Sequence, residues 1–196
     1  MSRLRCFLLF TIGCLAGHHL SAYLRRRPPS PSRIRLYCYI NTYERNYDLK
    51  AIHAQNTWAR KCDDFHFTST KPHTFLRIMH LNFTLPETRE HLWSKMRQIL
   101  TEVYRHSNDF EYFFKADDDT FAFIPNLRDL LQKYKPDQPF MLGYRWPLRI
   151  PGGYFSGGAG YVLSREALRL IVEQAVDRHP GCPTKDENME DVKMSE

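Results

Sequence analysis

An aromatic segment that ends in three consecutive carboxylates lies in the middle of this 196-residue chain. Residues 111–120 read EYFFKADDDT, and the aromatic run predicts a buried strand ending at Asp117, Asp118 and Asp119. Three adjacent like charges repel one another, so we expect a cation to hold them. Carboxylate oxygens suit Mg²⁺ and Mn²⁺, which also keep phosphate oxygens as ligands. The segment favours a metal–nucleotide diphosphate site, and the alternative is an acidic turn that caps the next segment.

The segments around this strand alternate between strand-like and helix-like patterns. This order predicts an α/β fold with a mostly parallel sheet flanked by helices. Ligands of such sheets bind beyond the carboxyl ends of the strands, where the acidic triplet lies. Strands are expected at residues 35–42, 65–68, 75–81, 111–117 and 140–144, and helices at 49–61, 87–107, 125–134 and 165–178.

Residues at the helix ends and on the helix faces fit these boundaries. Either Thr84 or Thr88 can cap the second helix, and Ser164 can cap the fourth. The first helix is expected to turn four side chains toward the sheet: Ile52, Ala54, Thr57 and Trp58.

The positive charge of the chain is concentrated before the expected sheet. The net charge is +6, but residues 1–35 hold seven arginines and no acidic residue. Of the 28 basic side chains, 21 therefore remain in residues 36–196, against 22 acidic ones. A near-neutral globular part argues against a nucleic-acid partner.

An apolar segment at residues 6–24 lies between these arginines. Its 19 residues are about enough to cross a thin bilayer. It is either a signal anchor or a signal peptide cleaved near Ser21 and Ala22, and both direct the rest of the chain into the secretory pathway. We favour an anchor, with a tail and signal-anchor helix at 1–24, a Pro/Ser/Arg stem at 25–34 and a lumenal domain at 35–196.

The cysteines suit an oxidising compartment. Cys38 lies on the first expected strand and Cys62 directly follows the first helix, so a disulfide between them would fasten that helix to the sheet. Cys182 is then left without a partner in the expected lumenal domain. One glycosylation sequon occurs, at Asn82 in an expected loop.

Four short motifs follow one another in an order that resembles a known enzyme family. Together they make residues 35–196 similar to glycosyltransferase family 31, and within it to the core 1 β1,3-galactosyltransferases. The motifs are WARKC at 58–62, FKADDDT at 114–120, GGAGYVLS at 157–164 and EDVKM at 190–194.

This resemblance implies a GT-A-type, Rossmann-like fold and a type II membrane protein of the Golgi with a lumenal catalytic domain. It implies Mn²⁺ as cofactor, UDP-galactose as donor and N-acetylgalactosamine linked to Ser or Thr as acceptor, with inversion of the anomeric centre. A homodimer is compatible with the sequence. The resemblance also implies that relatives continue beyond residue 196 with a metal-binding His and acceptor-binding aromatics, so the domain is expected to lack its C-terminal part.

Roles in the family carry over to matching positions. Asp191 resembles the catalytic base, and its alternative reading is a helix cap or an exposed acid in a polar tail. The glycine run at 157–160 would let the chain pass close beneath the donor sugar, or it is a bend where two backbones approach. Asp117 and Asp119 resemble the metal-binding pair, and the nucleotide-sugar-binding positions are Thr42, Glu87, Thr88, Arg89, Lys95, Asp117 and Asp118.

Two further hypotheses remain open. The chain could be a catalytically inactive relative that acts as a folding partner or binds UDP, although the intact acidic triplet argues against this. A secretory metal- or nucleotide-binding protein outside the family would not be expected to contain all four motifs in this order.

Overall fold

A computed structural model describes residues 33–186 and 188–195 of the chain, and the residues from Ile34 onward form one compact unit. The expected anchor at 6–24 and stem up to residue 32 lie outside the described residues. Within the described part, no helix is both long and apolar enough to span a membrane.

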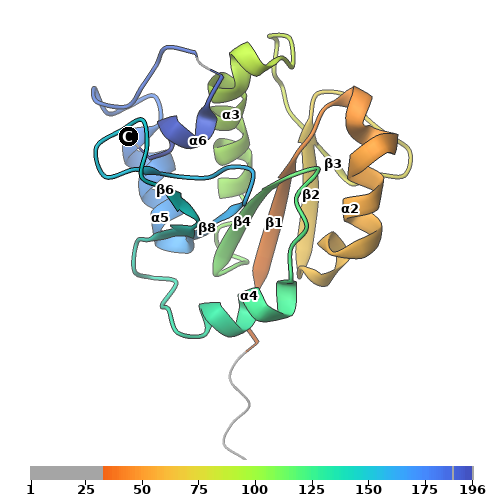
Figure 1. Cartoon of the computed structure of the whole chain (residues 1–196), viewed down its shortest axis with the longest axis horizontal. Helices are drawn as coiled ribbons and strands as arrows, with labels where there is room; N and C mark the ends of the chain where they lie inside the picture. The colour runs from red at the N-terminus through yellow and green to blue at the C-terminus, as the bar shows by residue number, and fades with distance from the viewer. Residues whose placement is uncertain (1–32, 187, 196) are drawn as a thin grey trace, which may run out of the picture. The chain divides into compact units, whose positions relative to one another are not determined.

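The unit is built on a six-stranded, mostly parallel sheet (Figure 1). In spatial order the strands are β3 (Ile78–His80), β2 (Asp64–Ser69), β1 (Leu36–Asn41), β4 (Tyr112–Asp117), β8 (Tyr161–Ser164) and β5 (Met141–Gly143). Strand β1 pairs in parallel with β2 and β4, β2 pairs in parallel with β3, and β8 is antiparallel to both β4 and β5. The predicted α/β class is confirmed, and the architecture fits a GT-A-type fold.

Helices cover both faces of this sheet. On one face, α2 (Ile52–Thr57) and α4 (Ile124–Leu131) pack on Cys38, Ile40 and Phe114. On the other face, α3 (Leu92–Tyr104) and α5 (Arg165–Leu170) pack on Tyr39 and Phe113. Alternate residues of β1 and β4 therefore enter two separate cores, as the pleat of a buried strand requires.

Short elements complete the chain between these helices and strands. The pair β6 (Arg145–Trp146) and β7 (Tyr154–Phe155) forms a separate two-stranded sheet. The remaining short helices are η1 (Glu44–Asn46), η2 (Tyr47–Ala51), η3 (Ala59–Lys61), η4 (Arg89–His91), η5 (Ile171–Ala175) and α6 (Glu190–Lys193).

The helix caps agree only in part with the sequence analysis. The Ser164 hydroxyl accepts a hydrogen bond from Ala167 N at 3.1 Å, as predicted for the start of α5. His91 occupies the cap position of α3, and Thr88 precedes η4 without a side-chain capping bond, so the prediction that Thr84 or Thr88 caps this helix is wrong.

On the inner face of α2, Thr57 is exposed and Gln55 is buried instead. Gln55 tolerates burial because its amide donates to Phe75 O and accepts from Arg77 N.

The predicted disulfide joins Cys38 on β1 to Cys62 after η3. Because the bridge closes a loop with a sequence separation of 24, chain entropy predicts that it contributes about 3.5 kcal/mol to the free energy of unfolding. We expect the Cys38→Ala/Cys62→Ala variant to lose about that much in urea unfolding. Cys182→Ala, which removes a cysteine with no disulfide partner among the described residues, is the control. Equal losses in both variants would contradict this account.

Candidate functional site

The carboxyl ends of β1 and β4 meet at the point where the strand order reverses. The chain leaves β1 toward β2 and β3 on one side and returns to β4 on the other. Asn41, the last residue of β1, pairs in register with Asp117, the last residue of β4. Such a switch point is where open α/β sheets bind ligands, and the acidic triplet lies on it.

Asp118 fastens the end of β4 to the segment after β1. Its carboxylate is buried and accepts hydrogen bonds from Thr42 Oγ1 at 2.7 Å and from Asn46 Nδ2 at 2.8 Å. Both donors orient the same oxygen, Oδ2. Thr42 and Asp118, both predicted to contact the nucleotide, are therefore brought into direct contact.

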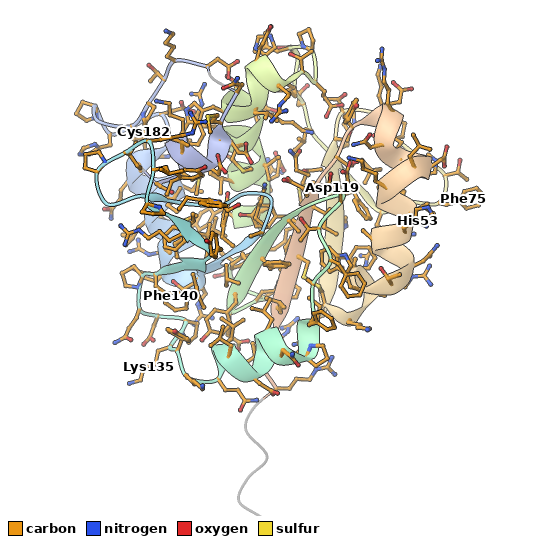
Figure 2. The ribbon with its side chains drawn as sticks, viewed as in Figure 1. His53, Phe75, Asp119, Lys135, Phe140 and Cys182 are labelled. Atoms are coloured by element: carbon orange, nitrogen blue, oxygen red, sulfur yellow. A yellow bond between two sulfur atoms is a disulfide. The ribbon has the colours of Figure 1, made fainter. Side chains whose placement is uncertain are left out.

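Asp119 is the exposed member of the triplet and lies beyond the ends of the strands (Figure 2). Lys50 of η2 places its Nζ 2.8 Å from Asp119 Oδ2 and 3.9 Å from Asp118 Oδ1. The Lys50 ammonium thus provides a cation to Asp118 and Asp119, two of the three adjacent carboxylates.

Lys115 is a fully buried cation on the same face of β4 as Asp117. Its Nζ donates to Asp117 Oδ1 at 2.7 Å, to Glu190 Oε1 at 2.9 Å and to the Gly157 carbonyl at 3.3 Å. Burial alone would lower the pKa of Lys115, but the Glu190 and Asp117 carboxylates outweigh burial and raise this pKa. Burial raises the pKa of Asp117, and the nearby Lys115 ammonium only partly offsets this.

Asp191 lies in the first turn of α6 and is tied to the glycine run. Its Oδ2 accepts a hydrogen bond from Gly157 N at 2.9 Å, and its Oδ1 accepts one from Val192 N at 2.9 Å. Met189, not Asp191, occupies the cap position of α6, and Asp191 is half-buried. The readings of Asp191 as a helix cap or as an exposed acid are therefore wrong.

A larger residue at Gly157 would crowd this arrangement. A Cβ atom there would lie 3.0 Å from Lys115 Nζ, 3.0 Å from Glu190 Oε1 and 3.2 Å from Asp191 Cβ. Because its N–H is bound to Asp191 and its carbonyl to Lys115, one peptide backbone joins the acidic strand to α6.

Lys95 and Glu87 connect the start of α3 to the same sheet edge. Lys95 Nζ lies 2.6 Å from the Thr42 carbonyl and 2.8 Å from Glu87 Oε1. Glu87 also accepts hydrogen bonds from the hydroxyls of Ser69 and Thr70. Thr88 and Arg89, which were predicted to contact the nucleotide with them, are exposed around η4.

The Glu87 contacts predict a dependence of stability on pH. Burial alone would raise the pKa of Glu87, but Lys95 and the hydroxyl donors outweigh burial and lower it. A lowered pKa stabilises the fold above the unfolded value of about 4.3, and this contribution is lost as the pH falls further. We expect Glu87→Gln to cost about 2 kcal/mol at pH 7 and progressively less below about pH 4.3, measured by urea unfolding. Glu90→Gln, on the exposed neighbouring turn, should cost little, and a Glu87→Gln loss that stays constant down to pH 3 would contradict the assignment.

The acidic edge has a donor set that suits a divalent cation. Within residues 33–186 and 188–195, no group of three or more His, Cys, Asp and Glu side chains converges on one point. Asp117 and Asp119 nevertheless supply hard carboxylate oxygens, and a cation that keeps phosphate and water ligands needs only one or two carboxylates. The residues therefore fit Mn²⁺ or Mg²⁺ bound together with a diphosphate.

Sequence reasoning missed Lys115, Glu190, Lys50 and Asn46 as parts of this site. Lys115 carried a usable signal, because a lysine inside an aromatic strand is buried only with a carboxylate partner. Lys50 and Asn46 carried none, since their partners are 69 and 72 residues away in the sequence.

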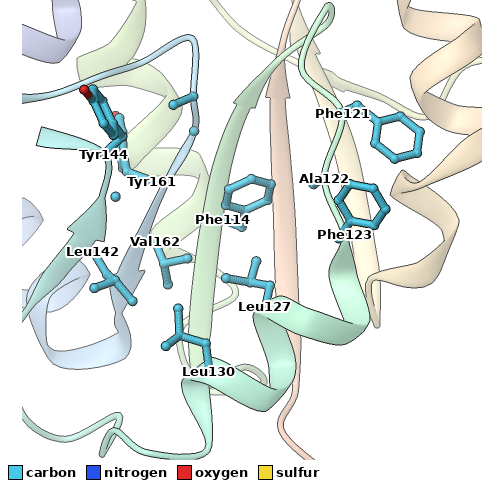
Figure 3. Close-up of a pocket in the computed structure, with 13 residues that line it drawn as sticks. Phe114, Phe121, Ala122, Phe123, Leu127, Leu130, Leu142, Tyr144, Tyr161 and Val162 are labelled. Atoms are coloured by element: carbon cyan, nitrogen blue, oxygen red, sulfur yellow. The ribbon is translucent and has the colours of Figure 1, made fainter.

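A separate apolar pocket of about 300 Å³ lies between α4 and the β8–β5 side of the sheet (Figure 3). Its walls include Phe114, Leu127, Leu130, Leu142 and Val162. Of the residues predicted to form the site, only the glycine run reaches it, through Ala159 and Gly160, and its apolar walls do not suit a metal or a diphosphate.

Asn82 is exposed in the loop between β3 and η4, which suits a glycosylation acceptor, and the glycosylation itself stays a prediction.

Comparison with known proteins identifies the family. Residues 36–194 match the Fringe-like family. Glycoprotein-N-acetylgalactosamine 3-beta-galactosyltransferase 1 of Xenopus laevis is 42% identical over 142 residues, which cover 72% of this chain and 39% of that protein. The Beta-1,3-glucosyltransferase of Mus musculus is 32% identical over 122 residues, which cover 60% of this chain and 24% of that protein. The match thus spans less than half of the length of either relative. The family match covers nearly all of the described residues, and the chain belongs to the Fringe-like family, within glycosyltransferase family 31.

Proposed function

We propose that this chain is a galactosyltransferase that moves galactose from UDP-galactose to N-acetylgalactosamine on Ser or Thr, with inversion, to form a core 1 O-glycan. One set of contacts at the switch point of the sheet carries the proposal. Lys115 donates to Asp117 and to the Gly157 carbonyl, and the Gly157 N–H donates to Asp191, so Asp117 and Asp191 belong to one connected site. The choice of donor and acceptor is supported by the name of the Xenopus laevis relative.

In this proposal Asp117 and Asp119 hold Mn²⁺, which when bound stabilises negative charge on the departing diphosphate. Asp118 keeps the end of β4 in register with Thr42, and the Lys95 ammonium holds the Thr42 carbonyl. These contacts fix the edge of the sheet against which the nucleotide binds before UDP-galactose arrives.

Asp191 is the proposed general base. An inverting transfer requires a base that takes the proton of the acceptor hydroxyl as the new bond forms, and a carboxylate can serve as one. The Gly157 N–H holds one oxygen of Asp191 and so orients this carboxylate. The proposed setting is the Golgi lumen, with residues 6–24 as the membrane anchor of a type II protein.

Calorimetric titration of UDP into the purified full chain, with and without Mn²⁺, tests the donor site. The proposal predicts metal-dependent binding that is lost in Asp117→Ala and in Asp119→Ala. Galactosyl transfer from UDP-galactose to a GalNAc-bearing peptide then tests the reaction. A folded chain that binds no UDP in the presence of Mn²⁺ would overturn the proposal.

A second candidate function is UDP binding without transfer. The observation in its favour is that lysines already neutralise two of the carboxylates, Asp117 through Lys115 and Asp119 through Lys50. Binding of UDP that does not require Mn²⁺, together with no transfer to any GalNAc peptide, would favour this candidate.

Removing Lys50 should strengthen the binding of Mn²⁺ by itself. The Lys50 ammonium is bonded to Asp119 Oδ2 and would compete with a cation for that oxygen. Because the pair is exposed, we expect Lys50→Ala to tighten Mn²⁺ binding by no more than about fivefold, measured by calorimetry without nucleotide. The exposed Lys61→Ala is the control. Weaker binding in Lys50→Ala would mean that Lys50 supports the metal site and does not compete for it.

A further inference from the structure

Lys115 connects the two halves of the proposed site. It is fully buried, and its three partners come from the end of β4, the glycine run and α6. The chain brings these segments together from positions 117, 157 and 190, so no local pattern enforces their contact. A buried ammonium is tolerated only when such partners satisfy it, and all three donor positions of Lys115 are used here.

The placement of α6 depends on its ties to other segments of the chain. The helix has only four residues, which is too short to be stable by itself. Glu190 binds Lys115, Asp191 binds Gly157 N, and Ser195 Oγ accepts from Phe155 N at 3.1 Å. Val192 adds one buried apolar side chain. Among these ties, the ion pair between Glu190 and Lys115 connects α6 to Asp117, because Lys115 also pairs with Asp117.

Binding of a cation at Asp117 should therefore change how firmly α6 is held. When Asp117 gives its oxygens to a divalent cation, the Lys115 ammonium meets added positive charge on that side and loses attraction to Asp117. Its remaining acceptors are Glu190 and the Gly157 carbonyl, and both fix the neighbourhood of Asp191. Stronger pairing on that side tightens α6 around the base.

We propose that Lys115 is a positioning residue that couples the filling of the donor site at Asp117 to the ordering of α6, so that Asp191 is set in place when metal and UDP are bound. This inference rests on the proposed function, because it requires a metal–nucleotide site at Asp117. It gives Lys115 a positioning role and makes the ordering of α6 depend on donor binding, and the donor site alone requires neither.

Hydrogen exchange of backbone amides tests the coupling without any measurement of transfer. In the full chain, Mn²⁺ with UDP should slow exchange across residues 188–195 about fivefold or more, the lower end of ordinary coupling strengths. Exchange across residues 112–120 reports the filling of the donor site itself. In Glu190→Gln, residues 112–120 should still be protected by Mn²⁺ and UDP, whereas residues 188–195 should not respond.

Matched variants separate coupling from general damage. Glu166→Gln removes a carboxylate from an ion pair with Arg169 on α5 and should respond like the parent chain. Lys115→Met should abolish the response of residues 188–195 and speed their exchange even without ligand. If that variant does not fold, Glu190→Gln decides alone. In transfer assays, Glu190→Gln should lower kcat at least about fivefold while the KM for UDP-galactose stays within about twofold.

The outcomes distinguish this inference from the proposed function. If residues 112–120 are protected and residues 188–195 are not, the donor site stands and the coupling is overturned. Equal protection of residues 188–195 in Glu190→Gln and in the parent chain also overturns it. No protection of either segment in the parent chain overturns the proposed donor site and the coupling together.

Discussion

Replacing Asp191 with Asn is expected to lower kcat for galactosyl transfer by about 10²–10⁴-fold, the range for loss of a general base. Asn keeps the shape of the side chain and an oxygen for the Gly157 N–H, but it cannot take a proton. The donor site should be intact, so Mn²⁺-dependent UDP binding should stay within about twofold of the parent chain. Steady-state transfer and calorimetry on the same preparation provide both numbers.

The exposed Asp129→Asn on α4 is the matched control for a loss of negative charge, and it should leave transfer unchanged. If Asp191→Asn transfers galactose as fast as the parent chain, Asp191 is not the general base. A parallel loss of UDP binding would assign Asp191 to the fold of the site and not to its chemistry.

The elements that carry the site could be predicted from sequence because their signals are local. The aromatic run before Asp117 and the apolar run before Thr42 each predict a buried strand. The helix expected at 49–61, between these two strands, has an apolar face. Parallel strands connected in this way place their carboxyl ends at one edge of the sheet. The meeting of Thr42 with Asp118 follows from this topology, and the structure places them 2.7 Å apart.

The interactions that complete the site could not be predicted in this way. The burial of Gln55 depends on backbone groups of Phe75 and Arg77, about 20 residues away in the sequence. Strand β8 was not predicted as a separate strand, and it pairs antiparallel with β4, whose Phe113 lies opposite Leu163. The partnership of Lys115 with Glu190 joins residues 75 positions apart. These contacts join residues far apart in the sequence, so tertiary packing determines them and local propensity does not.

Replacing Lys115 with Met is expected to cost about 3–5 kcal/mol of unfolding free energy, the usual result of removing one member of a buried charge pair. Methionine matches the length of the lysine stem, so the loss comes from the charge and not from a cavity. Without the ammonium, Asp117, Glu190 and the Gly157 carbonyl face one another unneutralised. Urea unfolding of Lys115→Met measures the loss, and Lys133→Met on the exposed surface after α4 should lose little.

A double-mutant cycle with Glu190→Gln decides whether the Lys115–Glu190 pair accounts for this loss. In Glu190→Gln alone, Lys115 keeps Asp117 as a partner, so we expect a smaller loss, about 1–3 kcal/mol. In the double variant, Glu190→Gln removes a carboxylate that no longer has its cation. The double variant should therefore lose less unfolding free energy than the sum of the two single-variant losses. Additive losses would mean that Lys115 and Glu190 act independently. In that case the buried cation would stabilise β4 through Asp117 alone, and α6 would be held by the Asp191–Gly157 hydrogen bond and its packing.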